Sequence, residues 1–358
     1  MPDPIILHQQ QLWSHPARRG VVYAGNASVT SERLKSFRWD WSVPAQGTGA
    51  GGTALFPLSL GCPPVPTSEG KEWIGKIIHG PDDVARFQPP PIDTGKCGEV
   101  LAQTRTIRET TPDSLIRQCD IQSPLGIAEL MWDGSFCTAL IEQPEAIPKL
   151  LDKITDFEIA FILEQKRIAG ERFIASSFPA IWPGSDGTFI ADDTMSLISP
   201  AMHLEFSVPY LNRISDACGG LHYHTCTLRP HCYDNVRAIR GIRGFNCNPG
   251  NSCPTHDIIR EFSGEFVFTF HLVVGMHATA DVLAWPRNAS GALVGAEKAS
   301  PRPFRSEAEF LRYWLDSMTG RTAMSIYFSD ICQVPEIIEP VYDLMDEYGF
   351  PPRACEMK

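Results

Sequence analysis

The sequence lacks a long uninterrupted apolar run and any excess of positive charge. Its most apolar stretch, residues 266–285, contains two histidines and an aspartate, whereas a membrane-spanning helix needs roughly 20 mainly apolar residues. Lysine and arginine together number 31 against 42 acidic residues, which gives a net charge of −11 at pH 7. This acidic balance argues against a nucleic acid or a membrane surface as the main partner.

Signals for export and for disulfides are also lacking. The first eight residues have no basic start and no long apolar core, so we expect a cytoplasmic protein. The eleven cysteines are an odd number in a long chain, which predicts free thiols or metal ligands rather than a disulfide framework. Six of them carry no motif and are interpreted as packing or surface thiols: Cys62, Cys97, Cys119, Cys137, Cys218 and Cys355.

Composition and breaker residues indicate how the chain is divided. With 43% hydrophobic and 20% charged residues, the chain can form a large folded core. Residues 1–115 are rich in glycine and proline, so we expect an irregular segment that packs on the rest. Residues 116–358 are expected to form the body, with an insertion at about residues 285–303, in one structural domain.

Helical and strand patterns alternate from about residue 122. A long helix is predicted from Pro144 to Gly170, and Ser199-Pro200 predicts the start of another that ends near residue 219. Other helices are predicted over 233–239, 255–262, 307–318 and 335–348, and strands over 172–177, 221–224, 244–247, 266–274 and 324–328. Repeated strand–helix units with short links predict a parallel sheet.

Nucleotide-binding signals are weak. No Gly-x-Gly-x-x-Gly opens a predicted helix, and no Gly-Lys-Ser/Thr is present. A doubly wound sheet and a closed barrel both fit six or more strand–helix units, and we expect the α/β fold to be a (β/α)8 TIM barrel. In such a barrel, the active site lies at the C-terminal ends of the strands.

The strongest polar cluster falls at such strand ends. His222 and His224 are two residues apart, as are His224 and Cys226, so each pair points to one face of a strand. Cys332 ends the last predicted strand. His224, Cys226 and Cys332 therefore predict a zinc site with an open position, which His222 could fill as a fourth ligand. Ordinary packing is the alternative, because buried cysteine usually behaves as a small hydrophobe.

Two further groups could reach the same mouth. Cys247 ends the next predicted strand, and Cys253 follows it closely. Asp192 and Asp193 lie between a Gly-rich loop and the Ser199-Pro200 helix start. Such carboxylates could position a substrate, orient a metal ligand or act as acid and base. A solvated acidic loop is the alternative.

The chain resembles the uroporphyrinogen decarboxylase superfamily, which includes the zinc-dependent methylcobamide:coenzyme M methyltransferases. The resemblance spans about residues 51–350. It is carried by residues 55–61, 70–73 and 143–151, and by Asp192-Asp193 together with residues 198–200 and 208–210. It implies a (β/α)8 barrel.

Within this superfamily, the motifs favour the methyltransferase branch. The decarboxylases carry an Arg-Gln-Ala-Gly-Arg-Tyr run near the N-terminus, which residues 15–20 do not match. His224, Cys226 and Cys332 match the zinc ligands of the methyltransferases in order and type, although Thr227 replaces a frequent glycine. The resemblance implies an enzyme that activates a thiol as a zinc thiolate and transfers a methyl group to it. The donor would be a corrinoid or a corrinoid protein.

Two other hypotheses stay open. One is a decarboxylase or lyase acting on a small or cyclic carboxylate, whose anchors would be Arg18, Arg19, Arg229 and Arg243. The other is a metal-binding or corrinoid-binding barrel without turnover, for which His222 would close the site. In each case the expected partner is a small molecule, and an apolar face could support a homodimer.

Overall fold

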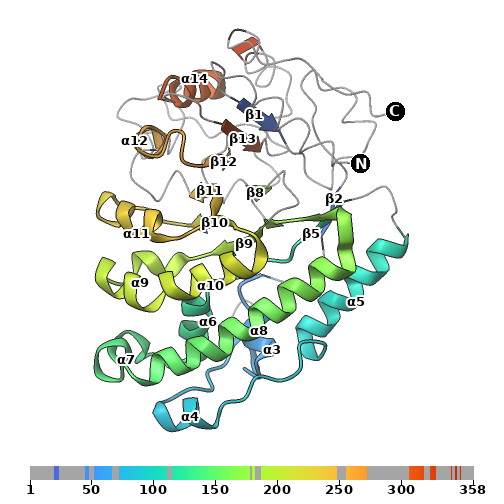
Figure 1. The fold of residues 1–358 in the computed structure, drawn as a ribbon, viewed down its shortest axis with the longest axis vertical. Coiled ribbons are helices and arrows are strands. Elements are labelled where there is room, and N and C mark those ends of the chain that lie inside the picture. The colour runs from blue at the N-terminus through green and yellow to red at the C-terminus, as the bar shows by residue number, and fades with distance from the viewer. Residues whose placement is uncertain are drawn as a thin grey trace.

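The computed structural model describes residues 20–23, 45–47, 52–66, 72–110, 115–177, 180–181, 187–247, 255–271, 306–317 and 323–327, together with positions 340, 343, 344 and 347. Several predicted features lie outside the described residues: Arg18, Arg19, Cys253, Cys332, Cys355, the insertion at 285–303 and most of the helix at 335–348. Within the described ranges the chain is a mixed α/β protein built on parallel strands (Figure 1).

Six strands form the larger parallel sheet. Their bounds are β1 (Gly20–Tyr23), β9 (Thr188–Ala191), β10 (Leu221–Thr225), β11 (Ile242–Cys247), β12 (Val267–His271) and β13 (Ala323–Tyr327). Their order is β1-β13-β12-β11-β10-β9, so the first strand of the chain pairs with the last one described. The predicted parallel sheet is confirmed.

A second parallel sheet contains three short strands, β2 (Ala45–Gly47), β5 (Leu115–Arg117) and β6 (Phe173–Ile174). It meets the larger sheet just after β5, where Gln122 bridges Ala191 at the end of β9. The Gln118 amide also donates to the Phe189 carbonyl and accepts from the Phe189 N–H, both at 2.9 Å. Among the described residues the strands form separate sheets rather than one ring, so the closed (β/α)8 barrel stays a prediction.

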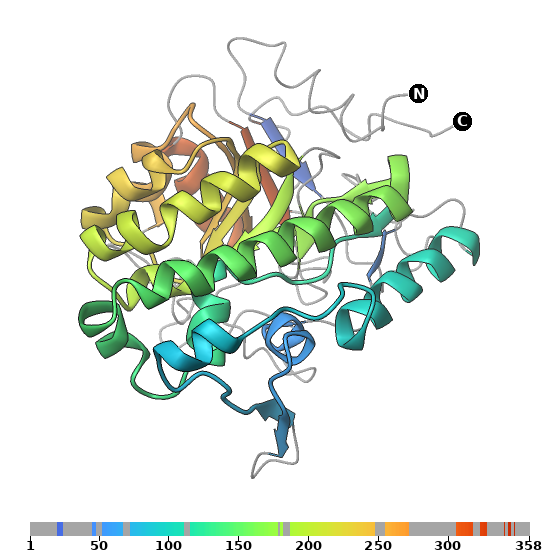
Figure 2. The same ribbon diagram turned by 60° about the horizontal axis from the view of Figure 1, so that its bottom comes forward.

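Helices alternate with the strands and pack along the larger sheet (Figure 1). Their bounds are α8 (Ala146–Ala169), α9 (Pro200–Phe206), α10 (Val208–Cys218), α11 (Tyr233–Ala238), α12 (Thr255–Glu261) and α14 (Glu307–Ser317). None of the helices in the described ranges has the length and apolarity needed to cross a membrane. Figure 2 shows the longest, α8, running across the molecule beside the strands.

The predicted helix start at Ser199 is confirmed, because its side chain accepts a hydrogen bond from the Met202 N–H at 3.2 Å. The prediction of a single helix up to residue 219 is wrong. The structure ends α9 at Phe206 and begins α10 at Val208. Pro209 explains the break, since proline has no N–H to donate and is accepted only in the first turn of a helix.

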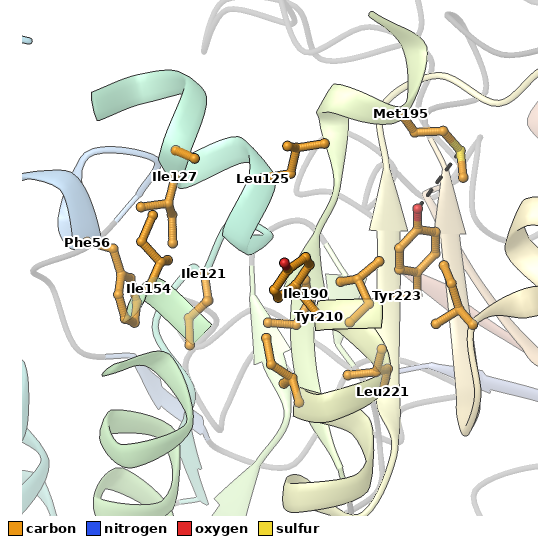
Figure 3. Close-up of a cluster of buried hydrophobic side chains, with 14 of the residues drawn as sticks. Phe56, Ile121, Leu125, Ile127, Ile154, Ile190, Met195, Tyr210, Leu221 and Tyr223 are labelled. Atoms are coloured by element: carbon orange, nitrogen blue, oxygen red, sulfur yellow. Dashed lines mark hydrogen bonds between the residues drawn. The ribbon is translucent and has the colours of Figure 1, made fainter. Parts of the chain in front are cut away.

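The core lies between these helices and the strands (Figure 3). Ile190 of β9 and Leu221 and Tyr223 of β10 point toward the helices, and α10 contributes Tyr210. All four are at least 93% buried. Burial of such apolar area is the main stabilising contribution in a fold of this kind.

Regular structure begins earlier than the sequence predicts. Helices lie within the segment expected to be irregular, namely α3 (Leu55–Ser59), α4 (Pro81–Arg86) and α5 (Gly95–Thr110), together with the hairpin of β3 (Pro64–Pro66) and β4 (Glu72–Ile74). The prediction that residues 1–115 form an irregular segment is therefore wrong for the part that these helices and strands occupy. The sequence pattern missed α5 because only four of its residues are buried, one of them a threonine and one a cysteine. The segment packs through α5 on α8.

The remaining short elements connect these layers. They are α6 (Pro124–Met131), α7 (Phe136–Glu142), β7 (Ser176–Ser177), β8 (Ala180–Ile181) and the 3₁₀ turns η1 (Gly170–Arg172), η2 (Asp193–Ser196) and η3 (Pro230–Cys232). The Gly-rich run at 47–52 falls in the sequence between β2 and α3. Since α3 has only five residues, this arrangement does not form the long helix of a dinucleotide site.

Candidate metal centre

The ends of β9, β10 and β11 lie in register at one edge of the larger sheet. His224 in β10 pairs with Ala191 in β9 and with Asn246 in β11. Because strand side chains alternate, His224 lies on the opposite face from Tyr223, which packs toward the helices. Phe189 shares the face of His224, and the two rings stack with centroids 6.1 Å apart. This face is where the polar cluster forms.

Three side chains bring metal-binding atoms together at this edge. His224, Cys226 and Asp193 each offer one ligand atom, and these atoms lie within 4.8 Å of one another. The Nε2 atom of His224 is 3.4 Å from Sγ of Cys226 and 3.7 Å from Oδ1 of Asp193. A tetrahedral zinc ion with ordinary bond lengths sets neighbouring ligand atoms roughly 3.3–3.8 Å apart. The residues present therefore fit a zinc ion.

The ring of His224 is held in the orientation that a metal ligand needs. Its Nδ1 atom forms a short hydrogen bond with Oδ1 of Asn246 from the neighbouring strand. With the amide oxygen as acceptor, Nδ1 carries the proton and Nε2 keeps a lone pair that faces Cys226. Metal-binding histidines usually have such a partner on the second ring nitrogen.

Cys226 lies at the mouth and is half-buried. Its backbone N–H donates to Oδ1 of Asp193 at 2.7 Å. Burial and the negative charge of Asp193 raise the pKa of the Cys226 thiol to about 12. The thiol is therefore protonated at neutral pH, and a bound divalent cation would reverse that balance by stabilising the thiolate.

Asp192 is fully buried, and its carboxylate accepts hydrogen bonds from five side chains. The donors are Ser123 (2.7 Å), His203 (2.8 Å), Thr194 (3.0 Å), Tyr223 (3.0 Å) and Ser207 (3.1 Å). Burial favours the neutral acid, but attraction to His203 and the hydrogen bonds outweigh it and lower the pKa of Asp192. Asp192 is thus an ionised internal anchor with no exposed surface.

The anchor fixes the loop that carries Asp193. The backbone N–H of Asp192 donates to the His224 carbonyl at 2.7 Å, and η2 begins at the next residue. Asp193 is therefore turned over the end of β10, where its side chain is 41% exposed. No lysine or arginine within the described ranges forms an ion pair with Asp193.

Of the other predicted ligands, the structure describes His222 and Cys247, and both lie outside this group. His222 is buried, with Nδ1 3.4 Å from the Ala175 carbonyl, and burial lowers its pKa to about 3. It is not part of the group formed by Asp193, His224 and Cys226. Cys247 belongs to the hydrophobic core on the helix side of β11. Cys253 and Cys332 lie outside the described residues, and no disulfide joins the cysteines that the structure describes.

Of the candidate arginine anchors, the structure describes Arg229 and Arg243, and Arg243 lies away from this edge. Arg243 lies beside Gly220, which precedes β10, and so sits at the opposite end of the strands from Cys226. Arg229 is exposed. The placement of Arg243 argues against a role in holding a substrate carboxylate at the mouth.

Sequence reasoning missed the residues that support the cluster, notably Asn246 and His203. The sequence pattern singles out Cys247 at the end of β11, yet alternation along this strand turns its neighbour Asn246 toward His224. His203 follows Ser199 by one helical turn and contacts Asp192. No local pattern in the sequence marks that contact.

No curated protein matches the chain. Among solved structures, it is similar to 2,3-dimethylmalate lyase, a PEP mutase/isocitrate lyase superfamily member, at 12% identity and a TM-score of 0.36, over 99% of this chain and 92% of that one. That score is too low to indicate the fold or the reaction. Residues 57–251, more than half of the sequence, match the uroporphyrinogen decarboxylase (URO-D) family, and the chain therefore belongs to that family.

Proposed function

We propose that the protein is a zinc-dependent enzyme of the URO-D-like superfamily that activates a thiol for methyl transfer from a corrinoid donor. One observation supports it above the others: His224 and Cys226 bring Nε2 and Sγ to 3.4 Å at the end of β10, with Asp193 beside them. Membership of the URO-D family supports the choice of reaction class, because the wider superfamily includes zinc-dependent methyltransferases.

His224, Cys226 and Cys332 would hold the zinc ion. Zinc bound there would lower the pKa of an acceptor thiol and present it as a thiolate nucleophile. Asn246 keeps Nε2 of His224 directed at the site, and Asp193 holds the backbone of Cys226 in place. Among His224, Cys226, Asn246 and Asp193, the side chains of Cys226 and Asp193 are the more exposed, so substrate would approach from their side.

The overall reaction balances as a methyl transfer to sulfur. The acceptor thiol gives up its proton, its sulfur gains the methyl group, and the methyl–cobalt bond breaks with its electron pair left on the corrinoid. Asp192 does not touch substrate in this proposal. It is buried under the loop and acts by holding Asp193 and the end of β10 in place.

The test is a methyl-transfer assay with the purified protein, free methylcobalamin and a panel of small thiols. Loss of the methyl group changes the visible absorption of the corrinoid and is followed directly. We expect thiol-dependent demethylation in the wild type and in Cys137→Ala, which removes an exposed cysteine far along the sequence. Cys226→Ala should lose both zinc and turnover. Retention of zinc and full turnover in Cys226→Ala would overturn the proposal.

The competing function is a decarboxylase or lyase on the same scaffold, favoured by the name of the matched family. It requires cationic anchors for substrate carboxylates, and Arg243 lies at the wrong end of the strands for that role. Carbon dioxide release from a candidate acid, independent of zinc and of added thiol, would favour this function instead. A corrinoid protein as donor and a homodimeric assembly are part of the proposal and need their own binding measurements.

A further inference from the structure

We propose that Asp193 is itself a ligand of the metal ion in the substrate-free protein, joining His224 and Cys226 through a carboxylate oxygen at the position that the acceptor thiol takes in the proposed reaction. This inference rests on the proposed function in one respect, that zinc binds at His224 and Cys226. It adds a ligand that the His-x-Cys motif does not contain and that lies 31 positions before His224 in the sequence. The metal site would then draw on two neighbouring strand ends, those of β9 and β10.

The distances between the ligand atoms of Asp193, His224 and Cys226 support coordination by Asp193. Oδ1 of Asp193 lies 3.7 Å from Nε2 of His224, and the ligand atoms of all three residues lie within 4.8 Å. At 3.7 Å, Nε2 of His224 and Oδ1 of Asp193 are too far apart for a direct hydrogen bond. A tetrahedral zinc ion sets a nitrogen and an oxygen ligand roughly 3.3–3.5 Å apart, so a small approach of the carboxylate would let the pair hold one.

The charge of the Asp193 carboxylate also favours a cation at this place. Asp193 has no lysine or arginine partner among the described residues, although its carboxylate faces a cysteine whose thiolate would carry the same charge. Cys226 donates its backbone N–H to Oδ1, which leaves lone pairs on both carboxylate oxygens. A carboxylate, a thiol that a bound cation would deprotonate and an imidazole lone pair make a donor set suited to a divalent cation.

The buried carboxylate of Asp192 holds Asp193 in position. Five side chains hold the Asp192 carboxylate, and its N–H is bound to the His224 carbonyl. The next residue therefore has little freedom, and its side chain is placed before any metal arrives. A ligand fixed in advance loses little conformational entropy on binding, which favours coordination over a solvated carboxylate.

The experiment compares zinc affinity among variants of the full-length protein. Asp193→Asn keeps the shape of the side chain and an oxygen for the Cys226 N–H but removes the negative charge. Asp82→Asn is the matched control, because Asp82 is an exposed aspartate on α4. Zinc affinity is measured by competition with a chromophoric chelator, and the Co²⁺-substituted forms are compared by their visible ligand-field bands.

We expect Asp193→Asn to bind zinc at least about tenfold more weakly than the wild type, the low end of the loss seen even for outer partners of metal ligands. Its Co²⁺ bands should shift, whereas Asp82→Asn should match the wild type in both readouts. Unchanged zinc affinity and an unchanged Co²⁺ spectrum in Asp193→Asn would overturn the inference. Thermal unfolding of the zinc-free forms shows whether Asp193→Asn is folded.

The outcomes separate this inference from the proposed function. If the wild type binds zinc and Asp193→Asn behaves as predicted, but no thiol accepts a methyl group, the proposed function fails and the ligand assignment stands. If methyl transfer is found and Asp193→Asn leaves the Co²⁺ spectrum unchanged, only the ligand assignment fails. A wild type that takes up no zinc or Co²⁺ overturns both.

Discussion

Asp192 and Asp193 are neighbours in the sequence, and the fold gives them opposite surroundings. Asp192 is fully buried, and its carboxylate accepts five side-chain hydrogen bonds. Asp193 is 41% exposed at the mouth of the site and faces His224 and Cys226. The same type of side chain occurs twice after the end of β9, with Asp192 in the interior and Asp193 at the site.

This difference shows how one loop can serve stability and chemistry at once. A buried carboxylate with a full set of donors is costly to remove but has no room for substrate. A half-exposed carboxylate without a basic partner contributes little to stability and is available to a cation.

The largest effect is expected from Asp192→Ala. The change removes the acceptor of five donors and leaves the buried groups of His203 and Tyr223, among others, without their partner. Breaking such a buried network costs about 3–5 kcal/mol in the free energy of unfolding. Urea unfolding at pH 7 measures the loss, and a cost under about 1 kcal/mol would show that Asp192 is not the anchor described here.

Asn246→Ala should weaken zinc binding with a smaller effect on folding. The variant leaves Nδ1 of His224 without its acceptor, so the ring can turn Nε2 away from Cys226. Loss of such an outer partner typically costs about 10–100-fold in metal affinity. Asn212→Ala is a control for the loss of an asparagine, because Asn212 contacts the backbone at positions 238 and 240. Equal zinc affinity in both variants would contradict the role given to Asn246.

Acid should remove the stability that the buried carboxylate of Asp192 contributes. The pKa of Asp192 is lowered in the folded protein, so the unfolded chain binds the proton more tightly than the native state. The stability from Asp192 is therefore present above the ordinary carboxyl pKa of about 4 and is lost as the pH falls through the lower folded value. Chemical unfolding from pH 5 downward should show this loss in the wild type and in Asp193→Asn. A slope in Asp192→Asn as steep as in the wild type would count against it.

The smallest effect is expected for Asp193→Asn in the zinc-free protein. Its carboxylate is 41% exposed, and the amide oxygen of the variant can still accept the Cys226 N–H. The free energy of unfolding should change by no more than about 0.5 kcal/mol, as for most surface substitutions. The measurement is urea unfolding in the presence of a chelator. A loss as large as that of Asp192→Ala would remove the distinction between the two residues.

Local patterns predicted the parts of the fold that depend on local chemistry. The helix ending at Gly170, the Ser199 cap and the strands around His224 follow from periodicity and capping, and the structure shows them. The break between α9 and α10 was missed although Pro209 marks it. Helix α5 was missed because its apolar face is narrow and includes a buried threonine and cysteine.

The candidate site shows the same limit. Alternation along a strand predicts that His224 and Cys226 point the same way, and the structure brings them to 3.4 Å. Register between strands decides the rest: it places Asn246 opposite His224, turns Cys247 into the core, and ends β9 so that Asp193 reaches Cys226. Register depends on long-range pairing, which no single segment of the sequence specifies.

The most direct test of the metal site is elemental analysis of the full-length protein, purified without added metal and again after zinc addition and desalting. The wild type and Cys137→Ala should each carry about one zinc ion per chain, as an open catalytic site requires, and Cys226→Ala should carry almost none. Absence of zinc from the wild type after both treatments would contradict the assignment of His224 and Cys226 as metal ligands.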